Sequence, residues 1–67
     1  MVNEEPIVPP TARYSIGEAA EILGIHRNTL RRHTNTGPNG IRCQFRRSNN
    51  RKFYTGLEIV KFWKASI

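Results

Sequence analysis

The feature that most constrains the fold is a pair of short helical patterns joined by a glycine-containing turn. Residues 15–18 read Ser-Ile-Gly-Glu, a capping box in which serine and glutamate satisfy free backbone groups at a helix start. A helix over about 16–23 then places its apolar residues on one stripe. Gly24 is suited to end that helix, because glycine readily takes the left-handed conformation. A second helix is expected over about 27–34 after only one or two residues, which predicts a helix-turn-helix unit.

The second helix has one face made of hydrogen-bond donors. The donors are Arg27, Asn28, Arg31 and Arg32, at i, i+1, i+4 and i+5. Leu30, His33 and Thr34 fall on the other face, with Thr29 at its edge. An ordinary amphipathic surface helix would pair its basic residues with acidic ones, and this face has none. We therefore expect the apolar face to pack, with His33 at least half-buried, and the donor face to bind a ligand.

The second half of the chain predicts a β-hairpin followed by a helix. Residues 37–40 (Gly-Pro-Asn-Gly) break the chain, and residues 41–46 alternate apolar and polar side chains as a half-buried strand does. Residues 51–54 can return as the partner strand, which leaves a tip of two arginines, a serine and two asparagines that folding does not need. Thr55 and Glu58 suggest a second capping box, for a helix over about 56–65 with a wide apolar face.

Apolar side chains of the hairpin and last helix are expected to form the core. Cys43 is interpreted as a small core or sheet residue. The aromatic residues Phe45, Phe53, Tyr54 and Trp63 are assigned to the core, because so small a domain needs aromatic burial. A stacking platform for single-stranded nucleic acid is the alternative for these rings.

Length and composition exclude several functions. A chain of 67 residues forms at most one domain with a modest core, so an enzyme with a deep pocket is not expected. Residues 1–13 contain three prolines and no apolar period, which predicts a flexible N-terminal arm before a domain over 14–67. Cys43 is the single cysteine, and the sequence has no paired carboxylates, so we expect no disulfide, metal, cofactor or catalytic site. No signal peptide or membrane-length apolar run is present, which predicts a soluble, cytoplasmic, nucleoid-associated protein.

The distribution of charge indicates the class of partner. Eight of the 11 lysines and arginines lie between His26 and Lys52, a stretch without Asp or Glu, and the formal net charge is +6. Such a block favours a polyanion, with nucleic acid ahead of a membrane surface. In a helix-turn-helix unit the second helix enters the major groove, where arginine can pair with guanine and asparagine with adenine. A basic hairpin that follows can lie along the backbone or reach into the minor groove. The candidate DNA-binding residues are Arg27, Asn28, Thr29, Arg31, Arg32, Arg46, Arg47, Ser48, Asn49, Asn50, Arg51 and Lys52.

Two segments resemble a known family. Residues 14–25 (Tyr-Ser-Ile-Gly-Glu-Ala-Ala-Glu-Ile-Leu-Gly-Ile), followed by Thr-Leu-Arg-Arg at 29–32, resemble the opening of MerR-type winged-helix domains. Lys-Phe-Tyr-Thr at 52–55 is similar to the segment with which that family closes its wing. The resemblance covers about residues 14–63 and implies an α+β winged helix-turn-helix that binds DNA, with Lys52 among the wing contacts. His26 stands where the family more often has Ser, Thr or Asp, so a weaker start of the second helix is expected.

Full MerR regulators continue into a long dimerisation helix, whereas this sequence ends four residues after Trp63. The chain is therefore also similar to excisionases, small basic recombination directionality factors that bind tandem sites, bend DNA and direct a tyrosine recombinase toward excision. This similarity implies an architectural factor with double-stranded DNA, a recombinase (integrase) and further head-to-tail copies of the chain as partners. A small transcription regulator is the alternative within the same class. A protein-interaction module that recruits a recombinase or terminase is the alternative from another class, with the exposed part of Leu57, Ile59, Phe62 and Trp63 as its partner surface.

Overall fold

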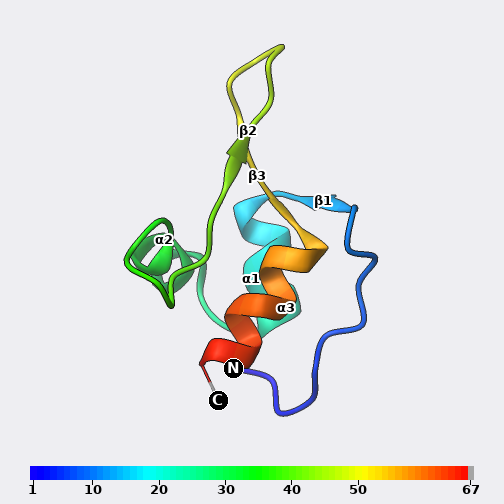
Figure 1. Cartoon of the computed structure of the whole chain (residues 1–67), viewed down its shortest axis with the longest axis vertical. Helices are drawn as coiled ribbons and strands as arrows, with labels where there is room; N and C mark the ends of the chain where they lie inside the picture. Colours follow the sequence, from blue (N-terminus) through cyan, green and yellow to red (C-terminus); the bar gives the residue numbers. More distant parts are fainter. Residues whose placement is uncertain (67) are drawn as a thin grey trace.

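The computed structural model describes residues 1–66 and confirms the winged helix-turn-helix fold. Its elements are β1 (Arg13–Tyr14), α1 (Ile16–Leu23), α2 (Arg27–His33), β2 (Gln44–Phe45), β3 (Lys52–Thr55) and α3 (Gly56–Ala65). The three helices gather at one end of the molecule, and the hairpin of β2 and β3 projects away from them as the wing (Figure 1). The predicted end of the domain, at residue 67, lies outside the described residues.

The first helix begins and ends as its sequence predicts. The Ser15 hydroxyl accepts the Glu18 backbone N–H at 3.2 Å, and Glu18 Oε1 accepts the Ser15 backbone N–H at 3.0 Å. Gly24 ends α1 with a φ of 73°, a left-handed conformation that glycine adopts without strain. Its N–H donates to the carbonyls of Ala20 and Glu21, which satisfies the end of the helix. Both ends of α1 are therefore set by local chemistry.

His26 caps α2, contrary to the expectation of a weak start. Its Nδ1 accepts the backbone N–H of Asn28 at 3.1 Å, as a Ser or Asp oxygen would at a helix N-cap. The helix ends one residue earlier than predicted, because Thr34 has extended backbone dihedrals and serves as the C-cap. Three residues, 24–26, form the turn between α1 and α2.

The sheet has a strand, β1, that was not predicted and that begins at Arg13, the last residue of the predicted arm. β1 pairs antiparallel with β3, which also pairs with β2, so the order is β1-β3-β2. The strand predicted over 41–46 is wrong in extent, because only Gln44–Phe45 pairs with β3. The reason is Ile41, whose backbone is already engaged by the end of α2. Its N–H donates to His33 at 3.0 Å, and its carbonyl accepts the N–H of Asn35 at 2.7 Å.

The core lies between the three helices and one face of the sheet. Its buried members are Ala19, Ala20, Leu23, Leu30, Ile41, Tyr54, Ile59, Phe62 and Trp63. Cys43 is half-buried against this cluster, which agrees with its assignment. Phe45 is a correction, because it is 51% exposed on β2, which extends beyond the helices. Leu57 is also a correction, being 53% exposed on α3.

The second capping box is only half formed. The Thr55 hydroxyl accepts the N–H of Glu58 at 3.3 Å, but the Glu58 carboxylate pairs with Lys61 at 3.7 Å. Two further N–H groups of the first turn of α3 are satisfied by the N-terminal segment. Those of Gly56 and Leu57 donate to the carbonyls of Ala12 and Pro10, at 3.0 and 3.2 Å. The N-terminal segment thus supplies part of the cap of α3.

The segment predicted to be a flexible arm lies along α1 and α3 (Figure 1). The Val2 N–H donates to the Leu23 carbonyl at 2.9 Å, and the Val2 carbonyl accepts from Trp63 Nε1 at 2.8 Å. Glu5 pairs with Lys64 at 3.2 Å. These contacts connect the start of the chain to both helices, and the flexibility of the arm in solution stays a prediction.

Candidate nucleic-acid interface

The outer face of α2 carries the predicted row of donors. Arg27, Asn28, Arg31 and Arg32 are all exposed, whereas Leu30 on the opposite face is fully buried. Thr29 is half-buried at the edge between the two faces. The burial of Leu30 fixes the rotation of α2, so the donors face solvent together.

One histidine and one arginine of α2 do not lie as a simple helical wheel predicts. His33 is exposed rather than half-buried, although its ring lies 5.6 Å from that of Phe62. Arg27 folds toward α1, so that a Cβ placed on Gly17 would lie 3.5 Å from its Nη2. Arg27 therefore lies at the edge of the donor row nearest α1.

The wing is tied to the end of α2 by the chain that joins them. Thr34 and Ile41 form a parallel β-bridge, and the Asn35 side-chain amide contacts Cys43, accepting its backbone N–H at 3.4 Å. A Cβ on Gly40 would collide with the carbonyls of His33 and Thr36, so this close approach requires glycine. The helix and the wing thus have a defined spacing.

All seven predicted wing residues, 46–52, are exposed at the far end of the molecule. The two asparagines of the tip have a structural role in its turn. Asn50 has a φ of 55°, a left-handed conformation that asparagine tolerates better than most residues. Asn49 Oδ1 accepts the backbone N–H of Arg51 at 3.1 Å and stabilises the turn. Arg47 and Arg51, on either side of the turn, are exposed.

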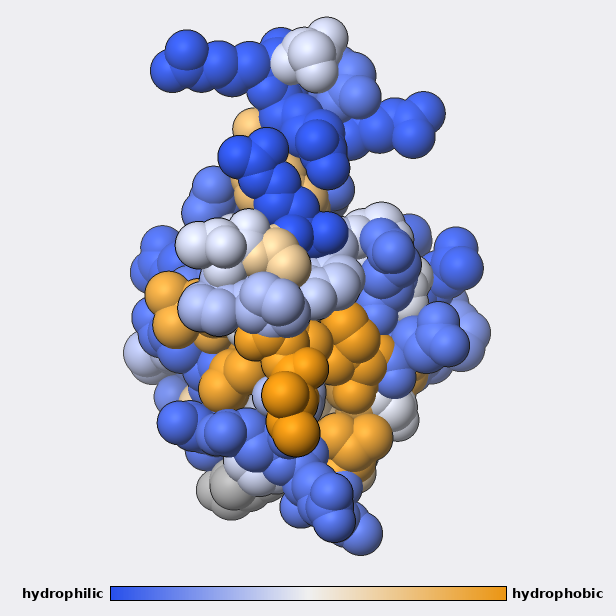
Figure 2. All heavy atoms as spheres, turned by 90° about the vertical axis from the view of Figure 1, so that its right-hand side faces the viewer, coloured by the Kyte–Doolittle hydropathy of each residue, from blue (hydrophilic) through white to orange (hydrophobic). Residues whose placement is uncertain are grey.

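The basic residues of α2 and the wing have no acidic partner within residues 1–66. The ion pairs described there are Lys61–Glu58 and Lys64–Glu5, both involving α3. The acidic residues lie on the N-terminal segment, α1 and α3, away from the wing. Figure 2 shows the wing as a mostly hydrophilic projection, with a small apolar area at its base, above a more apolar body. The unpaired charge of α2 and the wing is thus available to a polyanion.

Sequence reasoning missed Arg13, which is exposed on β1. Its guanidinium carbon lies 4.8 Å from the centre of the Phe53 ring, and that of Arg46 lies 5.6 Å from the same centre. The available signal was the adjacent pair of aromatic residues in a strand. Neighbouring side chains of a strand point to opposite faces of the sheet. Because Tyr54 lies in the core, the ring of Phe53 must be covered by residues on the other face.

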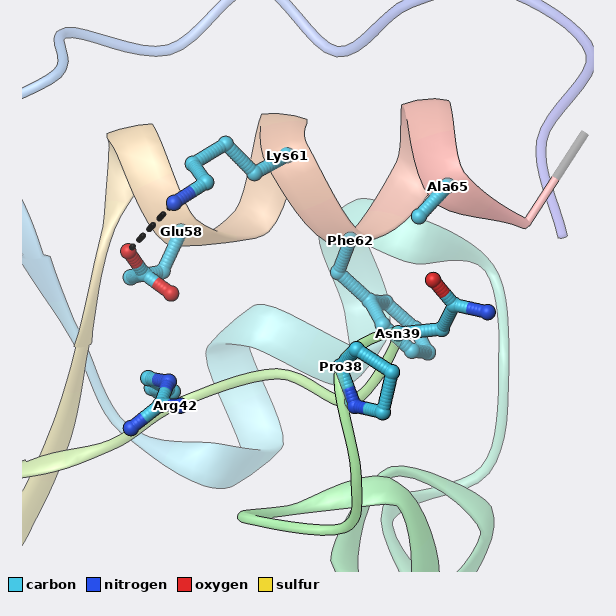
Figure 3. Close-up of a pocket in the computed structure, with 8 residues that line it drawn as sticks. Pro38, Asn39, Arg42, Glu58, Lys61, Phe62 and Ala65 are labelled. Carbon is cyan, nitrogen blue, oxygen red and sulfur yellow. Dashed lines mark ion pairs between the residues drawn. The ribbon is translucent and has the colours of Figure 1, made fainter.

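A small hollow lies between α3 and the loop before β2. It has a volume of about 120 Å³ and is lined by residues including Arg42, Glu58 and Lys61. Figure 3 shows the ion pair of Glu58 and Lys61 at one side, with Phe62 and Pro38 at the other. Among residues 1–66, no cluster of three or more His, Cys, Asp or Glu side chains is placed to hold a metal ion. None of the helices in that range has the length and apolar character needed to cross a membrane.

A two-helix unit with an exposed donor row, followed by a basic wing, defines a helix-turn-helix protein of the DNA-binding class. The family model described as a helix-turn-helix domain matches residues 13–65. The chain therefore belongs to the helix-turn-helix domain family. No curated protein and no solved structure matches the chain.

Proposed function

We propose that this protein binds double-stranded DNA in a sequence-specific manner, with α2 in the major groove and the wing against the adjacent backbone or minor groove. The observation that carries the proposal is the acid-free row of exposed donors on α2 beside an equally acid-free wing. In this arrangement Arg31 and Asn28 read base edges, and Arg47 and Arg51 hold phosphates or a narrow minor groove.

The division of labour between helix and wing can be tested by substitution. A bound site is first selected from a pool of random duplexes, and binding is then compared on that site and on a scrambled duplex. Asn28→Ala or Arg31→Ala is expected to cost about 1–3 kcal/mol on the selected site and to relax base preference. Arg47→Ala or Arg51→Ala is expected to weaken both duplexes more evenly. The assignment is wrong if the wing variants change base preference while the helix variants lose affinity uniformly.

The proposed biological role is that of an excisionase-like architectural factor that bends its DNA. Phe45 supports this role, because it is a half-exposed aromatic ring on the wing. Apolar side chains that enter a base step from the minor groove kink the duplex. A circular-permutation bending assay should show a smaller bend for Phe45→Ala than for the wild type at full occupancy. An unchanged bend, or no bend in the wild type, would favour a small transcription regulator that needs only the same DNA face.

In the interaction-module alternative, most of the residues assigned to the partner surface are buried. Ile59, Phe62 and Trp63 are buried, so they are closed to a partner protein. The exposed large apolar side chains of α3 and the N-terminal segment are Leu57 on the helix and Met1, Val2 and Ile7 on the segment. Figure 2 shows an apolar area on the face that it views. DNA binding remains the proposal, because the charge is concentrated on the other elements.

A further inference from the structure

The sheet has a second face that the core does not use. Along β3 the Tyr54 side chain points into the core, so that of Phe53 points to the opposite side. Phe53 is nevertheless only 6% exposed. Arg13 from β1 and Arg46 from the β2 side of the sheet cover its ring, each diagonal to Phe53 in the strand pairing.

The two residues that cover the Phe53 ring are both positively charged. Two guanidinium groups share one aromatic ring, which attracts each of them through its electron-rich face. An open hollow of about 430 Å³ beside the ring is also lined by Arg47, Ser48 and Gln44, and by no acidic residue. Like charges gathered at this density repel one another, so a bound anion would stabilise them.

The geometry points to a phosphate clamp in which Arg13 and Arg46, oriented by the Phe53 ring, bind a phosphodiester of the DNA backbone. This inference rests on the proposed DNA binding and extends the interface from the wing to β1. A guanidinium stacked on a ring keeps the N–H groups at its edge free, and these match phosphate oxygens in a bidentate fashion. Because the hollow is open and continuous with the wing, a polymer strand suits it better than an enclosed small molecule.

Phe53 acts in this account as a positioning residue. It adds no charge and touches no DNA, but it lowers the freedom of two long side chains before DNA arrives. Replacing it should therefore weaken binding with the net charge unchanged. Arg13→Lys also separates the effect of geometry from the effect of charge, and it leaves the sheet unaltered. Lysine keeps the charge and loses the planar, bidentate group.

The experiment measures duplex affinity by fluorescence anisotropy over a range of salt concentrations. Arg13→Ala and Arg46→Ala should each weaken binding about three- to tenfold on cognate and scrambled duplexes alike, and each should make the salt slope shallower by about 1. Phe53→Leu and Arg13→Lys should weaken binding although neither changes the net charge. Lys61→Ala is the matched control, because it removes one positive charge from α3. Thermal unfolding verifies that each variant is folded. If Phe53→Leu does not fold, the result for Arg13→Lys alone tests whether positioning contributes to binding.

Each outcome separates the clamp from the proposed function. A wild-type protein that binds no duplex overturns both. If the wild type binds and Arg31→Ala weakens it, but Arg13→Ala behaves like Lys61→Ala, the clamp alone is wrong. In a separate titration, inorganic phosphate alone is added to the wild type and to Arg13→Ala at constant ionic strength. Saturable phosphate binding that Arg13→Ala abolishes would show a site for small anions rather than for the DNA backbone, and none is expected.

Discussion

The phenol hydroxyl of Tyr54 lies 2.8 Å from Oγ1 of Thr34, in a hydrogen bond that joins β3 to the end of α2. The Thr34 hydroxyl donates its single proton to the Leu30 carbonyl, also at 2.8 Å, so Tyr54 is the donor and Thr34 the acceptor. Tyr54 is fully buried, and this contact is its polar anchor. The end of α2 and β3 are thus held together by one partly buried hydrogen bond.

Removal of this pair should cost stability. Tyr54→Phe is expected to lower the free energy of unfolding by about 1 kcal/mol, the usual net contribution of such a hydrogen bond. Urea unfolding followed by circular dichroism measures it. Tyr14→Phe is the matched control, because it removes the same atom from a half-buried tyrosine on β1. Equal losses for the two variants would contradict the role given to Tyr54.

The same residue should make stability depend on alkaline pH. Burial is the main cause that raises the pKa of Tyr54 above 10.0, with a smaller contribution from Cys43. A group whose pKa is raised by folding favours the folded state fully below its unfolded pKa, and the benefit is lost as pH rises through the folded value. The wild type should therefore lose stability above about pH 10 more steeply than Tyr54→Phe. Parallel urea titrations at pH 8 and above pH 10 test this, and identical pH profiles would contradict it.

The capping box of α1 should contribute measurably to the free energy of unfolding. Ser15→Ala removes the acceptor of the Glu18 N–H and should lower the free energy of unfolding by about 1 kcal/mol. The backbone hydrogen bond from Ser15, and then its hydroxyl, hold the pKa of Glu18 below 4.5. The stability from this carboxylate is present above its unfolded pKa and is lost as pH falls through the lower folded value.

Thermal unfolding at neutral pH and in acid checks both statements about the capping box. The difference between wild type and Ser15→Ala should shrink as the pH falls below about 4. Ser48→Ala on the wing is the control, since its side chain is exposed and lies far from any helix end. An effect of Ser48→Ala as large as that of Ser15→Ala would count against the capping assignment.

The sequence predicted the features that depend on local chemistry. The cap at Ser15, the stop at Gly24 and the burial of Leu30 follow from neighbours within one helical turn. The candidate donors of α2 and the wing followed from the same patterns, and the structure places all of them on the surface except Thr29, which is half-buried.

The features that were missed depend on contacts between distant segments. Ile41 fits a strand by alternation, but hydrogen bonds with the end of α2 remove its backbone from the sheet. The alternation of apolar and polar residues predicts that Phe45 is in the core. The wing has already extended past the helices at β2, so the ring is half exposed. Arg13 stood in a proline-rich arm, and its position over Phe53 appears only once β1 pairs with β3. For Ile41 and Phe45 the sequence carries no local signal, and for Arg13 the signal lies in a distant strand, in the adjacent aromatic residues Phe53 and Tyr54.

Assembly on DNA is a further prediction of the architectural proposal. The protein should be a monomer in free solution and should associate head-to-tail on direct repeats, because heterologous contacts can propagate along a duplex without closing. Sedimentation of the free protein, and of complexes with one, two and three repeats, should show one added protomer per repeat. A tight dimer without DNA that binds an inverted repeat would instead indicate a conventional dimeric regulator.

The most direct test of the central claim is the salt dependence of duplex binding by the wild-type protein. The acid-free surfaces of α2 and the wing are proposed to neutralise about four phosphates per protomer, so log K should fall against log salt with a slope of roughly −3 to −4. Anisotropy titrations on the selected site at several salt concentrations give this slope. A slope in that range supports a DNA interface built from α2 and the wing, and an affinity that does not change with salt would contradict it.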